Sequence, residues 1–341
     1  MNPERWQELK RVFQAALDIP RENRDLYLRD ACTDEELRRE VAALLESEEE
    51  STDFLSGGAM TYLPQDAQSG TGRRIGPFLI VRELGAGGMG TVYLAERESD
   101  FRQRVAVKLI RADVASGETT RRFTIERQTL AALHHPRIVR LIDGGTTEDG
   151  LPYLVVDYVD GIHIDKYCDT HKLGVEERLK LFLEVCGAVH YAHQSLVVHC
   201  DLKPSNILVT KEGVPMLLDF GIAKLLDPAS MGLATNIAQT RQRAFTPSYA
   251  SPEQLSGQPV TTAADVYALG VILYELLTGL SPYASADLAS PAAWIKSVCE
   301  DDAPAPSTTI PIETPERNSR ALRGDLDAIA LKALRKNPRD R

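Results

Sequence analysis

The first fifty residues carry apolar side chains at helical spacing. Leu9 and Phe13 belong to one amphipathic series, and residues 37–45 carry another. Thr33 and Glu36 have the spacing of a capping box, which marks the start of a helix. The pattern predicts a three-helix unit over residues 1–50, and the Gly-, Ser- and Gln-containing stretch at 51–74 predicts a flexible linker.

A different pattern begins at Phe78, where short β-type runs replace the helical period. Alternation or β-branched enrichment predicts strands at FLIVREL, TVYLAE, RVAVKLI, RIVRLID and LPYLVVDY. After about residue 164 the helical period returns and predicts helices over 175–195, 263–279 and 325–336, with a short helix over 292–299. Strands first and helices second indicate an α+β fold in two lobes.

Composition and charge narrow the classes of function. The 341 residues include 39 Lys and Arg against 49 Asp and Glu, and residues 1–70 account for −8 of the formal charge of −10. We therefore expect no nucleic-acid partner that binds through general basicity. The longest apolar stretch, residues 266–280, contains Glu275 and is shorter than the roughly 20 residues of a membrane span. It predicts a buried helix and no membrane span.

Cysteine usage and the N-terminus favour a cytoplasmic location. The five cysteines are odd in number, widely spaced and never arranged as CxxC, which is typical of a reducing compartment. The N-terminus, MNPERWQELK, carries charges where a signal peptide needs an apolar run of about 7–15 residues.

The glycine-rich segment LGAGGMG lies between two predicted strands. Glycines at these positions let backbone amides approach a phosphate chain closely. The GxGxxG pattern also occurs in dinucleotide-binding folds, but there it follows a strand and opens a helix. Because the strand-like run TVYLAE follows it here, we expect a loop that joins two strands of a hairpin.

Further motifs follow in order along the chain. Lys108 ends the run VAVK, Glu126 lies on a helical stretch, HCDLKPSN spans residues 199–206 and DFG spans residues 219–221. Together with LGAGGMG, the set resembles the eukaryotic-type (Hanks-type) serine/threonine protein kinases, and LGAGGMG and DLDAIALKAL resemble bacterial members in particular. The resemblance implies a bilobal protein-kinase domain over 75–341, with a β-rich N-lobe at about 75–159 and a helical C-lobe at about 160–341.

The resemblance assigns chemical roles to the charged residues of these motifs. Lys108, fixed by Glu126, is expected to contact the α- and β-phosphates of ATP. Asp201 is expected to orient the attacking hydroxyl and accept its proton, and Lys203 to steady the γ-phosphate. A lysine at that spacing accompanies serine/threonine specificity in this family. The expected ligands of Mg²⁺, or of Mn²⁺ in its place, are the side-chain oxygens of Asn206 and Asp219.

The resemblance also places the adenine slot and the hinge. Val156 corresponds to the gatekeeper and residues 157–159 to the hinge. Phe220, Leu130, Leu141 and His199 are expected to stack into a column that ends on Asp265. The expected ATP-binding residues are Leu84, Gly85, Ala86, Gly87, Gly88, Met89, Gly90, Val92, Ala106, Lys108, Asp157, Val159 and Leu208.

Residue 200 departs from the family pattern, because most members carry arginine where this chain has Cys200. A neutral thiol makes no charge-assisted pair with a phosphorylated activation-loop residue. Two interpretations stay open: a kinase active without that switch, or one in which Lys224, Arg241 and Arg243 substitute for the arginine. The candidate phosphorylation sites are Thr235, Thr240 and Thr246, and Thr246 most resembles a substrate-positioning threonine.

Some of these residues are also compatible with other functions. His190, His193, His199 and Cys200 could form a zinc cluster, although the kinase pattern already explains His193 and His199. Cys200 could be a redox sensor. A nucleotide-binding pseudokinase or scaffold is the alternative class, but the residues that catalysis needs are all present. The sequence therefore favours an enzyme that transfers the γ-phosphoryl group of ATP to Ser/Thr hydroxyls of proteins and phosphorylates itself.

The two ends of the chain raise separate expectations. Glu253, in SPE, resembles the APE glutamate of the family, and its arginine partner corresponds to Arg341. The position of Arg341 favours a cut through a longer, membrane-anchored kinase of which this is the cytoplasmic portion. The N-terminal helices are expected to bind a regulatory partner or to form a homodimer. The plainer alternative for them is a solvated acidic extension.

Overall fold

The computed structural model describes residues 71–87, 90–98, 102–110, 131–220, 247–283, 291–310 and 318–341. All of them belong to one compact unit, Ser69–Arg341. The predicted three-helix unit over 1–50 lies outside the described residues, as do the candidate phosphorylation sites, Glu126, Leu130, Gly88 and Met89.

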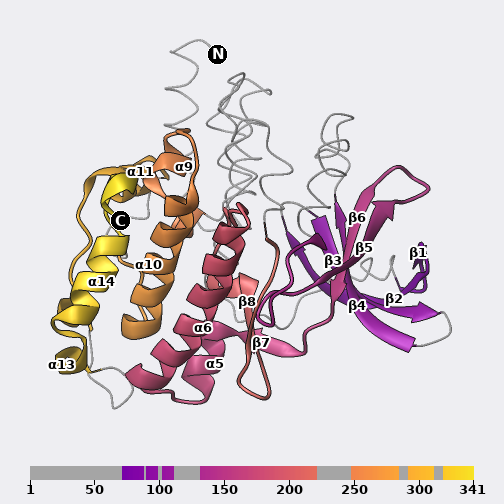
Figure 1. The fold of residues 1–341 in the computed structure, drawn as a ribbon, viewed down its shortest axis with the longest axis horizontal. Coiled ribbons are helices and arrows are strands. Elements are labelled where there is room, and N and C mark those ends of the chain that lie inside the picture. Colours follow the sequence, from indigo (N-terminus) through magenta and orange to yellow (C-terminus); the bar gives the residue numbers. More distant parts are fainter. Residues whose placement is uncertain are drawn as a thin grey trace, which may run out of the picture. The chain divides into compact units, whose positions relative to one another are not determined.

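An antiparallel six-stranded sheet with the order β1-β2-β3-β4-β6-β5 makes up the N-lobe. Alternate residues of its strands point inward, so that Val105, Val107 and Val155 form a small core with Phe78 and Tyr153. Figure 1 shows this sheet apart from the helices. Its strands are β1 (Arg74–Ile75), β2 (Phe78–Gly87), β3 (Gly90–Glu98), β4 (Arg102–Ile110), β5 (Leu141–Thr146) and β6 (Pro152–Asp157).

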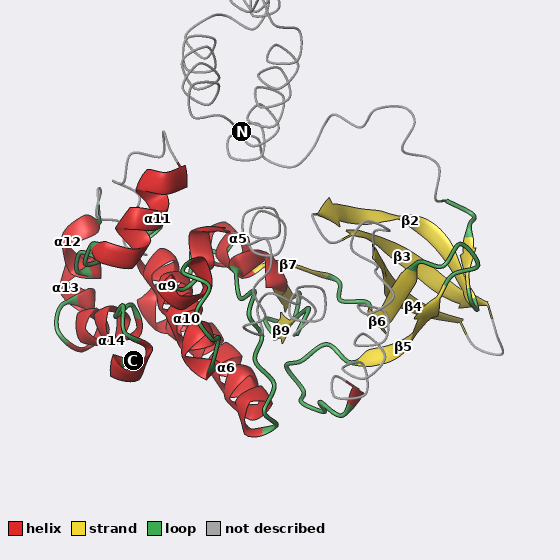
Figure 2. Cartoon of the chain, turned by 90° about the horizontal axis from the view of Figure 1, so that it is seen from above, coloured by secondary structure: helices red, strands yellow, loops and turns green. Residues whose placement is uncertain are grey.

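The C-lobe is helical and its core lies between two long helices, α6 and α10. A three-stranded sheet, β7-β8-β9, lies between these helices and the larger sheet (Figures 1 and 2). The elements are β7 (Gly161–His163), α5 (Ile164–Thr170), α6 (Val175–Gln194), β8 (Ile207–Thr210), β9 (Pro215–Leu217), α9 (Pro252–Leu255), α10 (Thr262–Thr278), α11 (Pro291–Glu300), α12 (Pro306–Thr309), α13 (Ser319–Leu322) and α14 (Asp325–Ala333). Single 3₁₀ turns occur at Pro204–Asn206, Pro247–Tyr249 and Pro338–Asp340.

Helix α10 is the apolar stretch that the sequence predicted to be buried, and most of its residues are buried. The Thr261 hydroxyl accepts a hydrogen bond from the N–H of Ala263 at its start, and Gly279 ends it in the left-handed conformation. A Cβ at Gly270 would lie 2.7 Å from that of Ala333, so glycine permits the close approach of α14. Among the described residues, none of the helices combines the length and the apolar character that a membrane crossing requires.

The predicted bilobal α+β fold is confirmed, and one strand boundary was wrong. The run RIVRLID predicted a strand from residue 137, whereas β5 begins at Leu141. Residues 137–140 pair elsewhere: Ile138 bridges Leu217 of β9, and the N–H of Val139 donates to the carbonyl of Leu217. The segment does alternate apolar and polar side chains. It pairs with β9 at the junction between the two lobes instead of extending β5.

Candidate active site

The described part of the glycine-rich segment lies at the ends of two paired strands, as the predicted hairpin requires. The ends of β2 and β3 pair at Gly87 and Gly90, and β3 continues antiparallel to β4. A Cβ at Gly90 would lie 2.0 Å from the carbonyl oxygen of Leu109, which excludes any other residue there. The expected ATP-binding residues lie on β2 (Leu84, Gly85, Ala86, Gly87), β3 (Gly90, Val92), β4 (Ala106, Lys108) and β8 (Leu208), with Asp157 ending β6 and Val159 following it.

Lys108 lies on β4 between Val92 of β3 and Leu154 of β6. Its ammonium lies 2.7 Å from the Oδ2 atom of Asp219, which follows β9. Burial by itself would raise the pKa of the Asp219 carboxyl, but the charge and hydrogen bond of Lys108 outweigh it and hold that pKa below its ordinary value. Asp219 is therefore ionised near neutral pH.

Three further polar side chains lie close together in the segment that follows α6. The Nζ atom of Lys203 lies 2.9 Å from the Oδ2 atom of Asp201. The amide of Asn206 donates to the backbone carbonyl of Asp201 at 2.8 Å and to its carboxylate at 3.3 Å. These contacts orient the Asp201 carboxylate, while its side chain keeps 15% of its surface exposed to solvent.

A buried carboxylate fixes the backbone that precedes Asp201. Asp265, in the first turn of α10, is 1% exposed. Its Oδ2 atom accepts from the N–H of His199 at 2.8 Å, and its Oδ1 atom accepts from the N–H of Cys200 at 2.9 Å. The His193 ring lies 2.7 Å from the same carboxylate. This set of contacts explains why the sequence has a charged, buried residue in the first turn of this mostly apolar helix.

The expected column across the lobes is present in its lower half. The ring centroids of His199 and Phe220 are 4.7 Å apart, and the Nε2 atom of His199 contacts the carbonyl of Leu218 at 2.8 Å. Leu141 is half-buried on β5. Glu126 and Leu130 lie outside the described residues. Among the described residues, Asp219 alone is a partner of Lys108.

The hinge presents backbone groups to a ligand. The N–H of Asp157 donates to the carbonyl of Arg140, and the carboxylate of Asp157 lies 3.3 Å from the Nε atom of Arg140. Within the described residues, the N–H of Val159 has no hydrogen-bond partner. A backbone donor of this kind can bind a ring nitrogen of a planar heterocycle.

The expected pair between Glu253 and Arg341 is confirmed. The guanidinium donates to both carboxylate oxygens, at 2.6 and 2.8 Å, and the two side chains are 2% and 1% exposed. The same guanidinium donates to the carbonyls of Ala263 and Lys336 and lies over the ring of Tyr267. The pair therefore ties α9 to the start of α10 and to the end of the domain.

The zinc alternative finds no support in the described part of the chain. That part contains no group of three or more His, Cys, Asp and Glu side chains able to hold a metal ion. His190 is exposed and contacts Gln194, whereas His193 and His199 contact Asp265 and the carbonyl of Leu218. Lys224, Arg241 and Arg243, the proposed substitutes for an arginine at position 200, lie outside the described residues.

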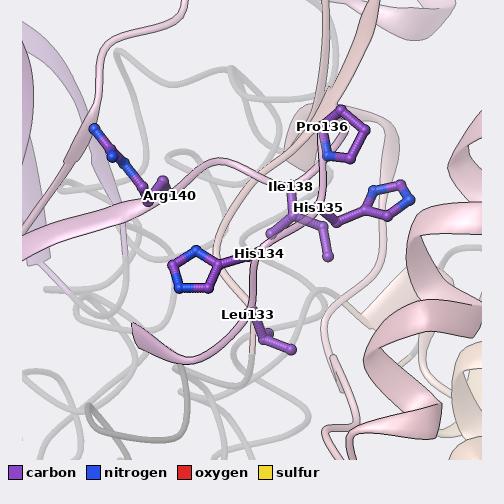
Figure 3. A pocket seen from close by; sticks show the side chains of 6 residues that line it. All are labelled: Leu133, His134, His135, Pro136, Ile138 and Arg140. Atoms are coloured by element: carbon purple, nitrogen blue, oxygen red, sulfur yellow. The ribbon is translucent and has the colours of Figure 1, made fainter.

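A cavity of about 190 Å³ has Arg140, which contacts Asp157 of the expected hinge, among its lining residues. Its lining residues are Leu133, His134, His135, Pro136, Ile138 and Arg140 (Figure 3). Burial lowers the pKa of His135, and Arg137 adds to the effect, so this imidazole is neutral near pH 7. None of the expected ATP-binding residues lines this cavity.

Sequence reasoning missed a contact between the segment before α9 and α10. The hydroxyl of Tyr249 donates to the Oε2 atom of Glu275 at 2.7 Å. Burial raises the pKa of Glu275 to about 7; the hydrogen bond from Tyr249 opposes the rise and the charge of Asp165 adds to it. The sequence feature that could have indicated this contact is a glutamate within an apolar helical run.

The raised pKa of Glu275 predicts a pH-dependent stability. Because the folded protein holds this proton and the unfolded chain, with a pKa of about 4.3, does not, stability falls as pH rises from about 4.3 to 7. In urea unfolding, the wild type should lose stability over this range relative to Glu275→Gln, with no further change above it. The exposed Glu148→Gln variant should follow the wild type. Parallel curves for Glu275→Gln and the wild type would contradict the assignment.

Comparisons with known proteins agree with this geometry. The protein kinase domain model matches residues 78–341. The chain is 37% identical over 263 residues to serine/threonine-protein kinase PknB of Mycobacterium leprae, covering 76% of this chain and 39% of that protein. It is 40% identical over 215 residues to serine/threonine-protein kinase PrkC of Bacillus subtilis, covering 62% of this chain and 32% of that protein. The chain thus spans about two fifths or less of the length of these relatives.

A solved structure gives the same result for the fold. The kinase domain of PknI from Mycobacterium tuberculosis superimposes with a TM-score of 0.57 at 29% identity, covering 83% of this chain and 94% of that one. The chain therefore belongs to the protein kinase family, among the eukaryotic-type serine/threonine kinases of bacteria.

Proposed function

We propose that this chain is an active protein kinase that transfers the γ-phosphoryl group of ATP to serine and threonine hydroxyls of proteins, its own included. The observation that carries the proposal is the contact of 2.7 Å between Lys108 and Asp219, which joins the glycine-rich sheet to the segment that follows β9. Phosphoryl transfer needs positioning and charge stabilisation more than covalent chemistry, and these residues supply both.

Each polar residue of the site has a distinct task in the proposed reaction. Lys108 holds the α- and β-phosphates through its ammonium. Asp201 orients the attacking hydroxyl and takes its proton, and Lys203, 2.9 Å away, neutralises charge on the transferred group. The N–H of Val159, which has no hydrogen-bond partner among the described residues, binds the adenine. Proteins with accessible Ser or Thr side chains are the substrates.

The donor set fits a hard divalent cation. Asp219 is held ionised, and Asn206 offers an amide oxygen while its nitrogen is occupied by Asp201. We propose Mg²⁺ as the ion, with Mn²⁺ able to replace it. When bound, the ion supplies charge neutralisation to the phosphate oxygens. Two protein ligands are enough, because phosphate oxygens and water complete the shell.

Residue 200 is neutral, and we propose that activity does not depend on a loop phosphate. Thr235 and Thr240 are then products of autophosphorylation, and Thr246 helps to position the substrate. A kinase that needed the phosphate would start slowly after dephosphorylation and accelerate as it phosphorylated itself.

One assay tests both points. Phosphatase-treated protein, freed of phosphatase, is mixed with γ-labelled ATP and Mg²⁺, and label incorporation is followed from the first seconds. We expect incorporation into serine and threonine without a lag, and none with EDTA. Absence of transfer by protein that binds ATP would favour the pseudokinase alternative. A pronounced lag would show that Lys224, Arg241 and Arg243, or other groups, do bind a loop phosphate.

We further propose residues 75–341 as the catalytic domain, 51–74 as a linker and 1–50 as a regulatory or dimerising module, within the cytoplasmic portion of a membrane-anchored kinase. The amphipathic pattern and net charge of the N-terminal segment support this assignment of the module. Unchanged activity and oligomeric state after deletion of residues 1–70 would leave only the plainer role of a solvated extension.

A further inference from the structure

The residue directly before Asp201 has an unfavourable backbone conformation. Cys200 has a φ of +67°, in the left-handed region that residues other than glycine seldom adopt. Such a conformation persists only where the surroundings fix the backbone from several sides. The Oδ1 atom of Asp265 accepts from the Cys200 N–H at 2.9 Å and so fixes one side. If residue 200 relaxed, the carboxylate of Asp201 would turn with it.

The other side of the Cys200 peptide is held by Gln254 of α9. Its Nε2 atom donates to the carbonyl of Cys200 at 2.8 Å, and the Gln254 side chain is buried. The orientation of the amide is fixed, because its Oε1 atom accepts from the N–H of Ser251 at 2.9 Å and from the Ser251 hydroxyl at 3.1 Å. A backbone N–H only donates, so the amide oxygen has to face Ser251 and the nitrogen has to face Cys200.

We propose that Gln254 is a positioning residue for the phosphoryl-transfer reaction. Its side chain joins α9 to the loop of Asp201 by a hydrogen bond. This bond needs neither a charged side chain at position 200 nor a phosphorylated activation-loop residue. The bond holds residue 200 in its left-handed conformation and thereby keeps the Asp201 carboxylate aimed at the acceptor hydroxyl. The inference rests on the proposed function. It assigns to the Gln254 side chain the activity that does not depend on a loop phosphate.

The test uses Gln254→Glu, which changes the donating nitrogen to an oxygen at nearly constant volume. The protonated acid still accepts from Ser251 and still donates to the carbonyl of Cys200. The ionised acid places a negative oxygen against that carbonyl and has no hydrogen to donate to it. The ratio of kcat for variant and wild type should be near one at pH 6 and should fall about 10-fold by pH 8.5, with the KM for ATP unchanged.

A matched control removes other causes of pH dependence. Gln258→Glu makes the same chemical change four residues later at an exposed position, and its ratio to the wild type should stay flat. The titratable and charged groups around the contact are Cys200, Asp201 with Lys203, Asp265 with His193 and His199, and the pair of Glu253 with Arg341. All of them are present in the wild type and in the control, so the ratio cancels their titration.

The outcomes distinguish a failure of this proposal from a failure of the proposed function. A ratio that stays near one at every pH for folded Gln254→Glu, or a rise in the KM for ATP at constant kcat, overturns the positioning role. Inactivity of wild type and Gln258→Glu alike would instead count against the proposed function. If Gln254→Glu does not fold, Gln254→Met, which lacks a donor at similar length, should lower kcat about 10-fold at every pH. Wild-type kcat in Gln254→Met would overturn the role equally.

Discussion

Replacing Asp201 by asparagine lowers the rate of phosphoryl transfer about 10²- to 10⁴-fold, the range typical for loss of a positioned proton acceptor. The asparagine amide can still contact Lys203, but it neither accepts a proton nor carries the charge that orients the hydroxyl. The affinity for ATP should change by no more than about 2-fold, because Lys108 and the hinge residues are untouched. Single-turnover transfer and fluorescence titration with ATP measure the two quantities.

The control for this variant is Asp149→Asn, the same change at an exposed aspartate that pairs with Arg73 at the far end of the sheet. It should keep the wild-type rate. A rate for Asp201→Asn within about 10-fold of the wild type would show that another group takes the proton. An equal loss in both variants would point to a general effect of the substitution.

Replacing Glu253 by glutamine destabilises the domain by about 3–5 kcal/mol. The variant leaves the guanidinium of Arg341, which is 1% exposed, facing a neutral amide that offers one acceptor where the carboxylate offered two. Removing one partner of a buried pair costs more than the pair contributes, because the remaining charge stays out of water. Urea unfolding followed by tryptophan fluorescence measures the difference.

Glu176→Gln is the matched control for this second prediction. Glu176 pairs with Lys180 one helical turn away, but the two side chains are 84% and 68% exposed. Exposed pairs of this kind contribute little to stability, because water screens both charges. A comparable loss in both variants would show that burial of the Glu253 pair does not set its strength.

Much of this site could be predicted because its residues occur in short, ordered motifs. Lys108, Asp201, Asn206 and Asp219 are spread over more than a hundred residues, and the structure brings Lys108 and Asp219 to 2.7 Å. The partner of Glu253 could be predicted for the same reason, from its place in the family pattern. Spacing alone would not have paired residues 88 positions apart.

The remaining features depend on packing, which periodicity does not reveal. Residues 137–140 have the alternation of a strand but pair with β9, because the partner of a strand is set by three-dimensional placement. Gln254 and Tyr249 act through single hydrogen bonds whose partners lie 54 and 26 positions away. A buried glutamine in SPEQ carries no sequence signal that distinguishes its contact with Cys200 from ordinary packing.

The pair of Glu253 with Arg341 also sets an order of events during protein synthesis. The carboxylate is made first, and the ribosome adds 88 residues before its guanidinium partner exists. At about 5–20 residues per second this takes roughly 4 to 18 s. Throughout that time α9, which carries Gln254, has no anchor at the end of the domain. In a nascent chain, α9 therefore gains this ion pair only after Arg341 has been translated.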